Sequence, residues 1–283
     1  MAWSPGAVSP LVFVLATLGI AVLGGLLGSL VGLGGGIVVV PALTLGLGVD
    51  FHVAVGASLV AVIATSSGAA AAYTRDHLSN LRVAMFLEVA TVAGAVTGAL
   101  VAGLVATSVL HVVFGGVLVV AALGMVTRRE DRASHPVASS ELADRLQLHG
   151  EYPDPIAGRT VGYRVARPGL GFGLMYLAGI TSGLLGIGGG TFKVPAMDLA
   201  MGLPLKVSTA TSNLMIGVTA AGAALVYLGR GEVNPYVAAP VALGVVAGAA
   251  LGARLMPRAD PRRLRALFVV VLVVTAGQML VAA

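Results

Sequence analysis

Two glycine-rich strings interrupt the apolar stretches of this chain, Gly32-Leu33-Gly34-Gly35-Gly36 and Gly186-Ile187-Gly188-Gly189-Gly190. Each is followed by a short apolar segment that contains a proline, Pro41 or Pro195. Consecutive glycines weaken a helix by about 1 kcal/mol each relative to alanine, and proline removes a backbone donor. Unpaired backbone groups are costly in hydrocarbon, so such breaks are tolerated only inside protein or beside water. We interpret them as a paired binding site.

An anion suits these breaks. A helix that starts after the glycines would direct free N–H groups and the positive end of its dipole at the ligand. Interrupted segments at matching places in two halves of a transporter mark its binding site. The alternative is that the glycines only allow helices to cross closely.

Charged residues inside the apolar segments are few, and each is a candidate for function. Lys193 follows the second break and would add to the attraction of an anion; alternatively its ammonium extends to a membrane interface. Asp198, five residues further on, could pair with Lys193 or carry a coupling proton. Glu88 begins its segment and reads first as an interfacial or helix-N-terminal carboxylate. If it lies deeper, it is a candidate proton relay.

Hydroxyl and amide side chains gather in the third segment of each half, where they could replace the hydration of an anion. Most serines and threonines there are expected to bond their own helix carbonyls, whereas a buried amide such as that of Asn213 needs partners. The predicted anion-binding residues are Gly34, Gly35, Gly36, Gly188, Gly189, Gly190, Thr191, Lys193, Ser58, Ser212 and Asn213. Glu88 and Asp198 are the candidates for proton coupling.

The composition predicts a membrane protein. The chain has 283 residues, of which 57% are hydrophobic and 10% charged, with a mean hydropathy of +0.97. Soluble domains carry about 25% charged residues. Several apolar runs approach the ~20 residues that cross a bilayer as a helix, and they are apolar all round. We therefore expect an all-α polytopic protein in the lipid bilayer.

Other classes are disfavoured by the residue inventory. The net charge of +5 comes from basic residues that flank apolar segments, which indicates orientation in the membrane rather than nucleic-acid binding. The chain has no cysteine, which excludes disulfides and thiolate chemistry. Neither a His/Asp/Glu cluster with metal spacing nor a nucleophile–base pair is visible. We expect no metal, no cofactor and no enzymatic activity.

Ten apolar segments divide into two sets of five, separated by a polar linker. The predicted domains are 1–126, 127–167 and 168–283. Val8–Val31 lacks a basic n-region and is expected to be a retained helix. The other first-half segments are Ile37–Gly48, His52–Ala72, Arg82–Ala106 and Leu110–Val126. The second-half segments are Pro168–Leu185, Thr191–Met201, Lys206–Leu228, Tyr236–Leu255 and Leu264–Val281. In the linker, we expect a short helix from Ser139 to Leu148, a turn at Tyr152–Pro155 and a strand at Thr160–Val165, together forming a small cytoplasmic hairpin.

The two sets are homologous at one fixed offset of 154 residues, the separation of Gly32 from Gly186. Prolines, tyrosines and phenylalanines keep step with the glycines: Pro41 with Pro195, Tyr73 with Tyr227, Gly94 with Gly248 and Phe114 with Phe268. If every segment crosses and the linker is cytoplasmic, five crossings per half turn the second half upside down. Nearly all basic residues then lie inside, with Arg230 outside and Lys193 at a break. We expect inverted repeats with both termini outside. If the short segments do not cross, the halves are parallel and the arginines from Arg254 to Arg265 lie outside.

The motif blocks resemble a known family. Gly24-Gly25-Leu26-Leu27-Gly28, with the first break and Pro41, and Gly183-Leu184-Leu185 running through the second break to Lys193-Val194-Pro195, resemble the TauE/SafE family of sulfite and organosulfonate exporters. The stretch Val207–Ser212 is similar to the family's A-x-x-T-S stretch, whereas Ala54–Ser58 is more diverged. The resemblance implies export of sulfite, sulfoacetate or related sulfonates across a prokaryotic inner membrane.

The leading hypothesis is a secondary transporter, exporting a small sulfur-containing anion by alternating access coupled to H⁺ or Na⁺. The first alternative is a passive anion channel without a coupling ion. The second is a membrane subunit whose linker recruits a soluble partner.

Overall fold

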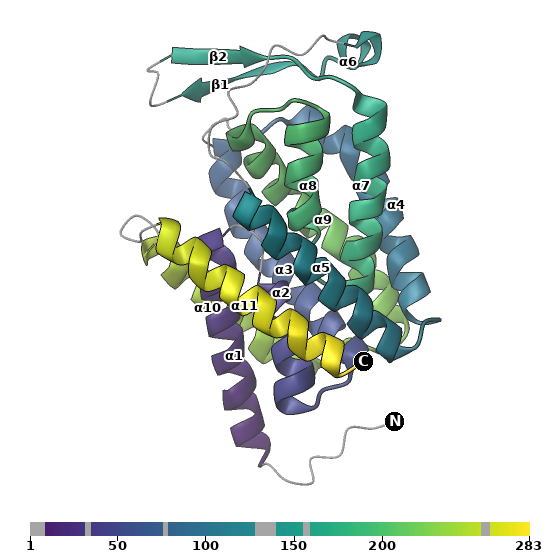
Figure 1. The fold of residues 1–283 in the computed structure, drawn as a ribbon, viewed down its shortest axis with the longest axis vertical. Helices are drawn as coiled ribbons and strands as arrows, with labels where there is room; N and C mark the ends of the chain where they lie inside the picture. Colours follow the sequence, from purple (N-terminus) through teal and green to yellow (C-terminus); the bar gives the residue numbers. More distant parts are fainter. Residues whose placement is uncertain (1–8, 32–34, 76–78, 128–139, 155–158, 256–260) are drawn as a thin grey trace.

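The computed structural model describes residues 9–31, 35–75, 79–127, 140–154, 159–255 and 261–283. The chain folds into helices of very unequal length, with one small hairpin (Figure 1). In the first half they are α1 (Pro10–Val31), α2 (Gly36–Pro41), the π-helical turn η1 (Ala42–Gly46), α3 (Phe51–Arg75), α4 (Leu81–Ala102) and α5 (Thr107–Thr127). In the second half they are α7 (Pro168–Leu185), α8 (Gly190–Pro195), η2 (Ala196–Ala200), α9 (Leu205–Gly229), α10 (Pro235–Leu255) and α11 (Pro261–Val281).

The all-helical membrane architecture is confirmed. In the described part of the chain, six helices are long and apolar enough to span a bilayer, within α1, α4, α5, α7, α9 and α10. By contrast, α2 with η1 and α8 with η2 each contain six plus five residues. At ~1.5 Å per residue each covers only about half of a ~30 Å hydrocarbon layer. The protein is a multi-pass membrane protein with short helices after both glycine strings.

The helices pair between the halves rather than within them. Four extensive contacts join α1 to α10, α4 to α7, α3 to α9 and α5 to α11, and α4 also packs on α9 and α3 on α10. Shifting the first half by 154 residues turns α1 into α7 and α4 into α10, so each pairing maps onto itself or onto another of the four. Figure 1 shows α1 rising from the N-terminal end while α7 descends from the hairpin. Equivalent helices of two inverted halves would run in opposite directions, as α1 and α7 do. The repeat itself stays a prediction.

Glycines allow these pairs to approach at backbone distance. A Cβ at Gly94 or Gly98 of α4 would overlap carbonyl oxygens of α7, and a Cβ at Gly179 or Gly183 of α7 would overlap those of α4. Apolar side chains on both helices would forbid this contact, and membrane helices use small residues for it. Close crossing is thus the role of these four glycines.

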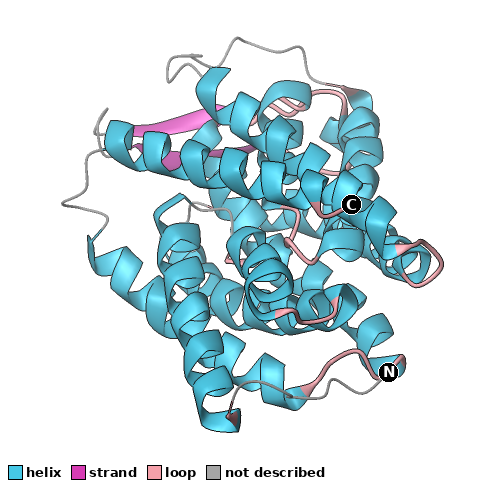
Figure 2. Cartoon of the chain, turned by 60° about the horizontal axis from the view of Figure 1, so that its bottom comes forward, coloured by secondary structure: helices cyan, strands magenta, loops and turns pink. Residues whose placement is uncertain are grey.

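The linker forms α6 (Glu141–Arg145) and the antiparallel strands β1 (Gly150–Asp154) and β2 (Arg159–Tyr163). The helix, although shorter than predicted, and the second strand agree with the sequence-based expectation. Figure 2 shows the two strands at one side of the helices. The expected turn at Tyr152 to Asp154 is wrong, because these residues are the end of β1, and Pro155 lies outside the described residues. Pro153 is tolerated there because each strand of a two-stranded hairpin has an open edge.

The hairpin and α6 pack onto the helices. Ala143, Leu148 and Val165 belong to one buried apolar cluster with residues of α4, α7, η2 and α9. A larger cluster joins α1, α2, α3, α5, α10 and α11 with the other parts of α4, α7 and α9. The first of these clusters includes Leu87, which precedes Glu88, and Met215, whose carbonyl accepts from Thr219.

Candidate functional site

The two glycine strings meet in the fold. A Cβ at Gly36, the first residue of α2, would lie 2.5 Å from the carbonyl oxygen of Gly186 and 2.6 Å from Ser58 Oγ. Ser58 Oγ on α3 donates to that same carbonyl at 2.8 Å. On the other side, a Cβ at Gly188 would lie 3.0 Å from Val62 of α3 and from Ile216 of α9. The strings thus form one joint between the halves, flanked by α3 and α9.

The second string has a backbone that only glycine adopts readily. Gly188 and Gly189 both have a φ of +72°, and α8 starts at Gly190. Two successive left-handed residues turn the chain from α7 into the short helix. In the first string Gly35 is right-handed, with a φ of −70°, and Gly34 lies outside the described residues.

Lys193 reaches from α8 into the centre of the protein. Its side chain is completely buried, and Nζ donates to Thr219 Oγ1 on α9 at 2.6 Å. Thr219 Oγ1 in turn lies 2.6 Å from Glu88 Oε1 on α4 and 3.0 Å from the carbonyl of Met215. Because the ammonium can only donate, the single hydroxyl hydrogen of Thr219 is free to bond the carboxylate. One hydroxyl therefore connects a buried cation to a carboxylate.

This chain of three residues has spare hydrogen-bonding capacity. Within the described part of the protein, Glu88 Oε2 and Ser182 Oγ are buried and have no hydrogen-bond partner. A Cβ at Gly189 would lie 3.2 Å from Ser182 Cβ and 3.4 Å from Lys193 Cε, so Ser182 and Lys193 flank the same glycine. A buried ammonium and carboxylate are strongly unfavourable unless paired. Ionisable groups held at such cost within membrane helices mark functional sites.

The remaining predicted site residues lie in different environments. Ser212 is buried, and its hydroxyl has no partner in the described part of the chain. Asn213 is half-buried and donates to the Thr209 carbonyl of its own helix at 3.1 Å. Asp198 is half-buried in η2, and the side chain of Thr191 lies outside the described residues. The interfacial alternatives for Lys193 and Glu88 do not fit, because Lys193 is enclosed and Glu88 lies two turns inside α4.

Sequence reasoning did not single out Ser182 or the bridging role of Thr219. The repeat contained one usable signal. At the 154-residue offset, Lys193 corresponds to Val39, and Glu88 corresponds to Ala242. Each of the two charged residues therefore occurs in one half only, and the equivalent position in the other half is apolar. In the structure Lys193 and Glu88 are linked through Thr219.

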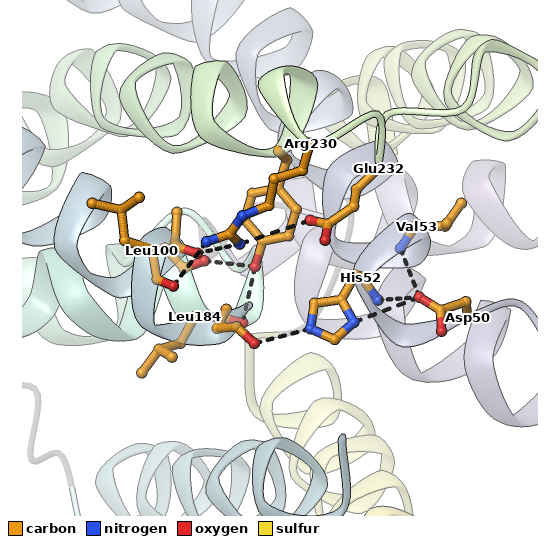
Figure 3. A network of polar contacts seen from close by, with 11 residues as sticks. Asp50, His52, Val53, Leu100, Leu184, Arg230 and Glu232 are labelled. Atoms are coloured by element: carbon orange, nitrogen blue, oxygen red, sulfur yellow. Dashed lines mark hydrogen bonds and ion pairs between the residues drawn. The ribbon is translucent and has the colours of Figure 1, made fainter. Parts of the chain in front are cut away.

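A second polar network closes one end of the helices (Figure 3). Arg230, at the end of α9, donates to the Ala99 carbonyl at 2.7 Å and to the Leu100 carbonyl at 2.8 Å. Glu232 lies 4.0 Å from the guanidinium. The guanidinium thereby satisfies carbonyls in the last turn of α4, which have no partner within the helix.

Two other side chains of this network bind neighbouring helix ends. Tyr227 is fully buried, and its hydroxyl donates to the Gly183 carbonyl of α7 at 3.0 Å. His52 Nε2 lies 3.0 Å from the Ala102 carbonyl of α4, and the ring stands beside Asp50 (Figure 3). The ends of α3, α4, α7 and α9 are consequently held together at this end.

A known family matches most of the chain. The family model described as sulfite exporter TauE/SafE matches residues 17–279. The chain belongs to the TauE/SafE family. A Bacillus subtilis relative, the "probable membrane transporter protein YunE", is 27% identical over 274 residues, covering 94% of this chain and 96% of its own length. A second from B. subtilis, the "probable membrane transporter protein YdhB", is 25% identical, covering 83% of this chain and 88% of the relative.

A relative from Methanocaldococcus jannaschii, also described as a "probable membrane transporter protein", is 27% identical over 256 residues. The match covers 85% of this chain and 85% of the relative. No solved structure matches the chain. Membership of the TauE/SafE family supports a role in membrane transport.

Proposed function

We propose that this protein is a secondary transporter that exports a small sulfur-containing anion, such as sulfite or an organosulfonate. The observation that carries the proposal is the fully buried Lys193 beside the second glycine string, where that string touches the first. A buried ammonium with unused hydrogens attracts an anion, and Ser182 Oγ, unpartnered in the described structure, offers a further donor. The family to which the chain belongs is described by sulfite export.

The arrangement also favours alternating access. The anion would bind at the joint between the halves, and its two sides belong to α3 and α9, which pair across the same joint. Rocking one half against the other would then expose the anion to each side in turn. We place the protein in the inner membrane, with the linker cytoplasmic and both termini outside, in agreement with the distribution of arginines.

Flux in proteoliposomes tests the proposal. Purified protein is reconstituted, and the uptake of labelled sulfite and sulfoacetate is measured with and without an imposed pH gradient. We expect accumulation of one anion above its equilibrium level when the gradient is present. Flux that only dissipates the anion's own gradient would instead indicate a channel.

A substitution that replaces the Lys193 side chain with a neutral one of nearly equal size tests the binding site. Lys193→Met keeps the length of the side chain and removes its charge, and we expect uptake to fall at least tenfold. Lys206→Met, at an exposed position at the start of α9, is the matched control and should keep its uptake. Equal uptake by the wild type and Lys193→Met would contradict the proposed site. Deleting the linker residues 140–154 tests the partner-recruiting alternative, which requires this segment.

A further inference from the structure

The contacts of Glu88, Thr219 and Lys193 suggest how an anion and a proton are linked, an inference that rests on the proposed function. In the structure, the charges of buried Lys193 and half-buried Glu88, whose Oε2 is enclosed, compensate each other through the Thr219 hydroxyl. The pair is separated by one oxygen rather than joined directly. A third group could therefore take over the ammonium without removing a direct salt bridge.

An arriving anion would change this balance. Ser182 and Lys193 both border Gly189, so an anionic oxygen there could accept from Ser182 Oγ and from the unused hydrogens of Nζ. The ammonium would then neutralise the anion and no longer Glu88. A buried carboxylate left without compensation is disfavoured by several kcal/mol. Taking up a proton removes that penalty.

The hydrogen bonds can rearrange to accept this proton without leaving a donor unpaired. When Glu88 is ionised, the hydroxyl of Thr219 donates to Oε1. When Glu88 is protonated, the carboxyl O–H can donate to Thr219 Oγ1, whose own hydrogen then turns to the Met215 carbonyl, 3.0 Å away. Thr219 is thus a positioning residue with two alternative orientations, each fully bonded.

Few other groups act on Glu88. From α8 the facing charge is Lys193, from α9 the facing group is the Thr219 hydroxyl, and on α4 itself Thr91 is adjacent. From α7, the Tyr176 hydroxyl bonds Thr97, two turns further along α4. In the described part of the chain, Lys193 is the charge that acts on this carboxylate. Its state is consequently set by whether Lys193 is engaged by Glu88 or by the anion.

We propose that Glu88 is the coupling site, and that each anion bound by Lys193 and Ser182 is accompanied by one proton on Glu88. The proton bonds to a carboxylate oxygen of Glu88 when the anion enters and leaves when the anion departs. At the 154-residue offset Lys193 corresponds to Val39 of the first half and Glu88 to Ala242 of the second, so the other half does not duplicate this pair of charges. One proton therefore moves with one anion in the same direction, so net export requires an outward anion gradient that exceeds the inward proton gradient.

Anion affinity as a function of pH tests the coupling. An alkanesulfonate such as methanesulfonate is the probe, because its charge is constant between about pH 5 and 9. Linkage requires that the affinity of the wild type rise as pH falls, by up to about tenfold per pH unit for one proton. In Glu88→Gln this dependence should be lost at and below about pH 7, the range in which the Lys193 ammonium keeps its proton. Proton movement driven by a sulfonate gradient is followed with a pH dye enclosed in the proteoliposomes. In Glu88→Gln this proton movement should be lost, while exchange of sulfonate for sulfonate is still measurable.

Two further variants make the test specific. Thr219→Val keeps both charges but removes the bridge, and it should flatten the pH dependence, whereas Thr219→Ser should restore it. Asp198→Asn, the other candidate for proton coupling, should keep the dependence. A pH dependence that survives in Glu88→Gln, or that is lost in Asp198→Asn instead, would overturn the inference and leave transport standing. Failure of the wild type to move any anion would overturn the proposed function as well.

Discussion

Ser58 Oγ donates a 2.8 Å hydrogen bond to the Gly186 carbonyl, a residue 128 positions away in the other half of the chain. The bond joins α3 of the first half to the glycine string of the second. Gly36 packs against both atoms, so the three residues are the point at which the two strings touch. Any movement of one half against the other must change this contact.

Alanine at Gly36 should separate the strings. Its Cβ would lie within 2.6 Å of both the Gly186 carbonyl oxygen and Ser58 Oγ, and neither can retreat without losing the bond between them. We expect anion uptake to fall at least tenfold and stability to fall by about 1–3 kcal/mol, as in other overpacked sites. Gly19→Ala on α1, with open space around the new methyl, is the control. Uptake and thermal unfolding of the purified variants measure both effects.

The left-handed turn before α8 provides a second comparison. Gly189 and Gly231 have φ values of +72° and +73°, so alanine is equally strained at both, by roughly 1–2 kcal/mol. At Gly189 the methyl would also lie 3.1 Å from the Ala178 carbonyl and 3.2 Å from Ser182 Cβ, whereas Gly231 has open space. We expect similar losses of stability but a loss of sulfonate affinity only in Gly189→Ala. Equal affinities in a binding assay would place the anion elsewhere.

Alanine substitutions at two glycines of α7 distinguish the effect of helix packing on stability from the effect of helix propensity. A Cβ at Gly183 of α7 would overlap the Ala95 carbonyl of α4, whereas a Cβ at Gly173 meets nothing. Gly183→Ala should therefore force α4 and α7 apart, with a cost of several kcal/mol or failure to fold, judged by the yield of monodisperse protein. Gly173→Ala should be neutral or stabilising by up to about 1 kcal/mol. A well-folded Gly183→Ala would contradict the close crossing.

Arg230 can bond two adjacent carbonyls because its guanidinium donates from two nitrogens at once, to Ala99 and Leu100. Lysine has a single nitrogen at this point and does not reproduce the fork. We expect Arg230→Lys to lower the free energy of unfolding by about 1–3 kcal/mol. Arg82→Lys, an exposed position at the start of α4, is the control and should be within ~0.5 kcal/mol of the wild type. Thermal unfolding in detergent distinguishes the two.

The docking of the linker should depend on alkaline pH. Tyr163 in β2 accepts a 2.8 Å hydrogen bond from Asn80 Nδ2 at the start of α4, and burial raises the pKa of Tyr163 above its ordinary value of 10.0. A raised pKa means that the docked state favours the neutral phenol. This contribution is complete below the ordinary value and is lost as pH rises through the raised pKa. Unfolding temperatures measured from pH 8 upward should fall more steeply in the wild type than in Tyr163→Phe; Tyr236→Phe, at an exposed ring, should behave as the wild type does.

The sequence alone was sufficient to predict the long apolar helices and their membrane environment. Apolar runs of bilayer length predicted the long helices closely; Pro168–Leu185 was predicted with the bounds that α7 has. The short helices after the glycine strings followed from glycine and proline chemistry, which acts locally on the backbone. The family followed from the same motifs and is confirmed by the match over residues 17–279.

The partners of each buried polar group were decided by the tertiary structure. From spacing, Asp198 was a natural partner for Lys193, five residues away, and Glu88 was first an interfacial carboxylate. The fold instead brings Glu88 of α4 and Thr219 of α9 to Lys193. Hydrophobicity and backbone propensity are properties of a segment and can be read along the chain. Which hydroxyl meets which charge depends on how far apart and at what rotation three helices pack, and here that depends on glycines that let their backbones touch.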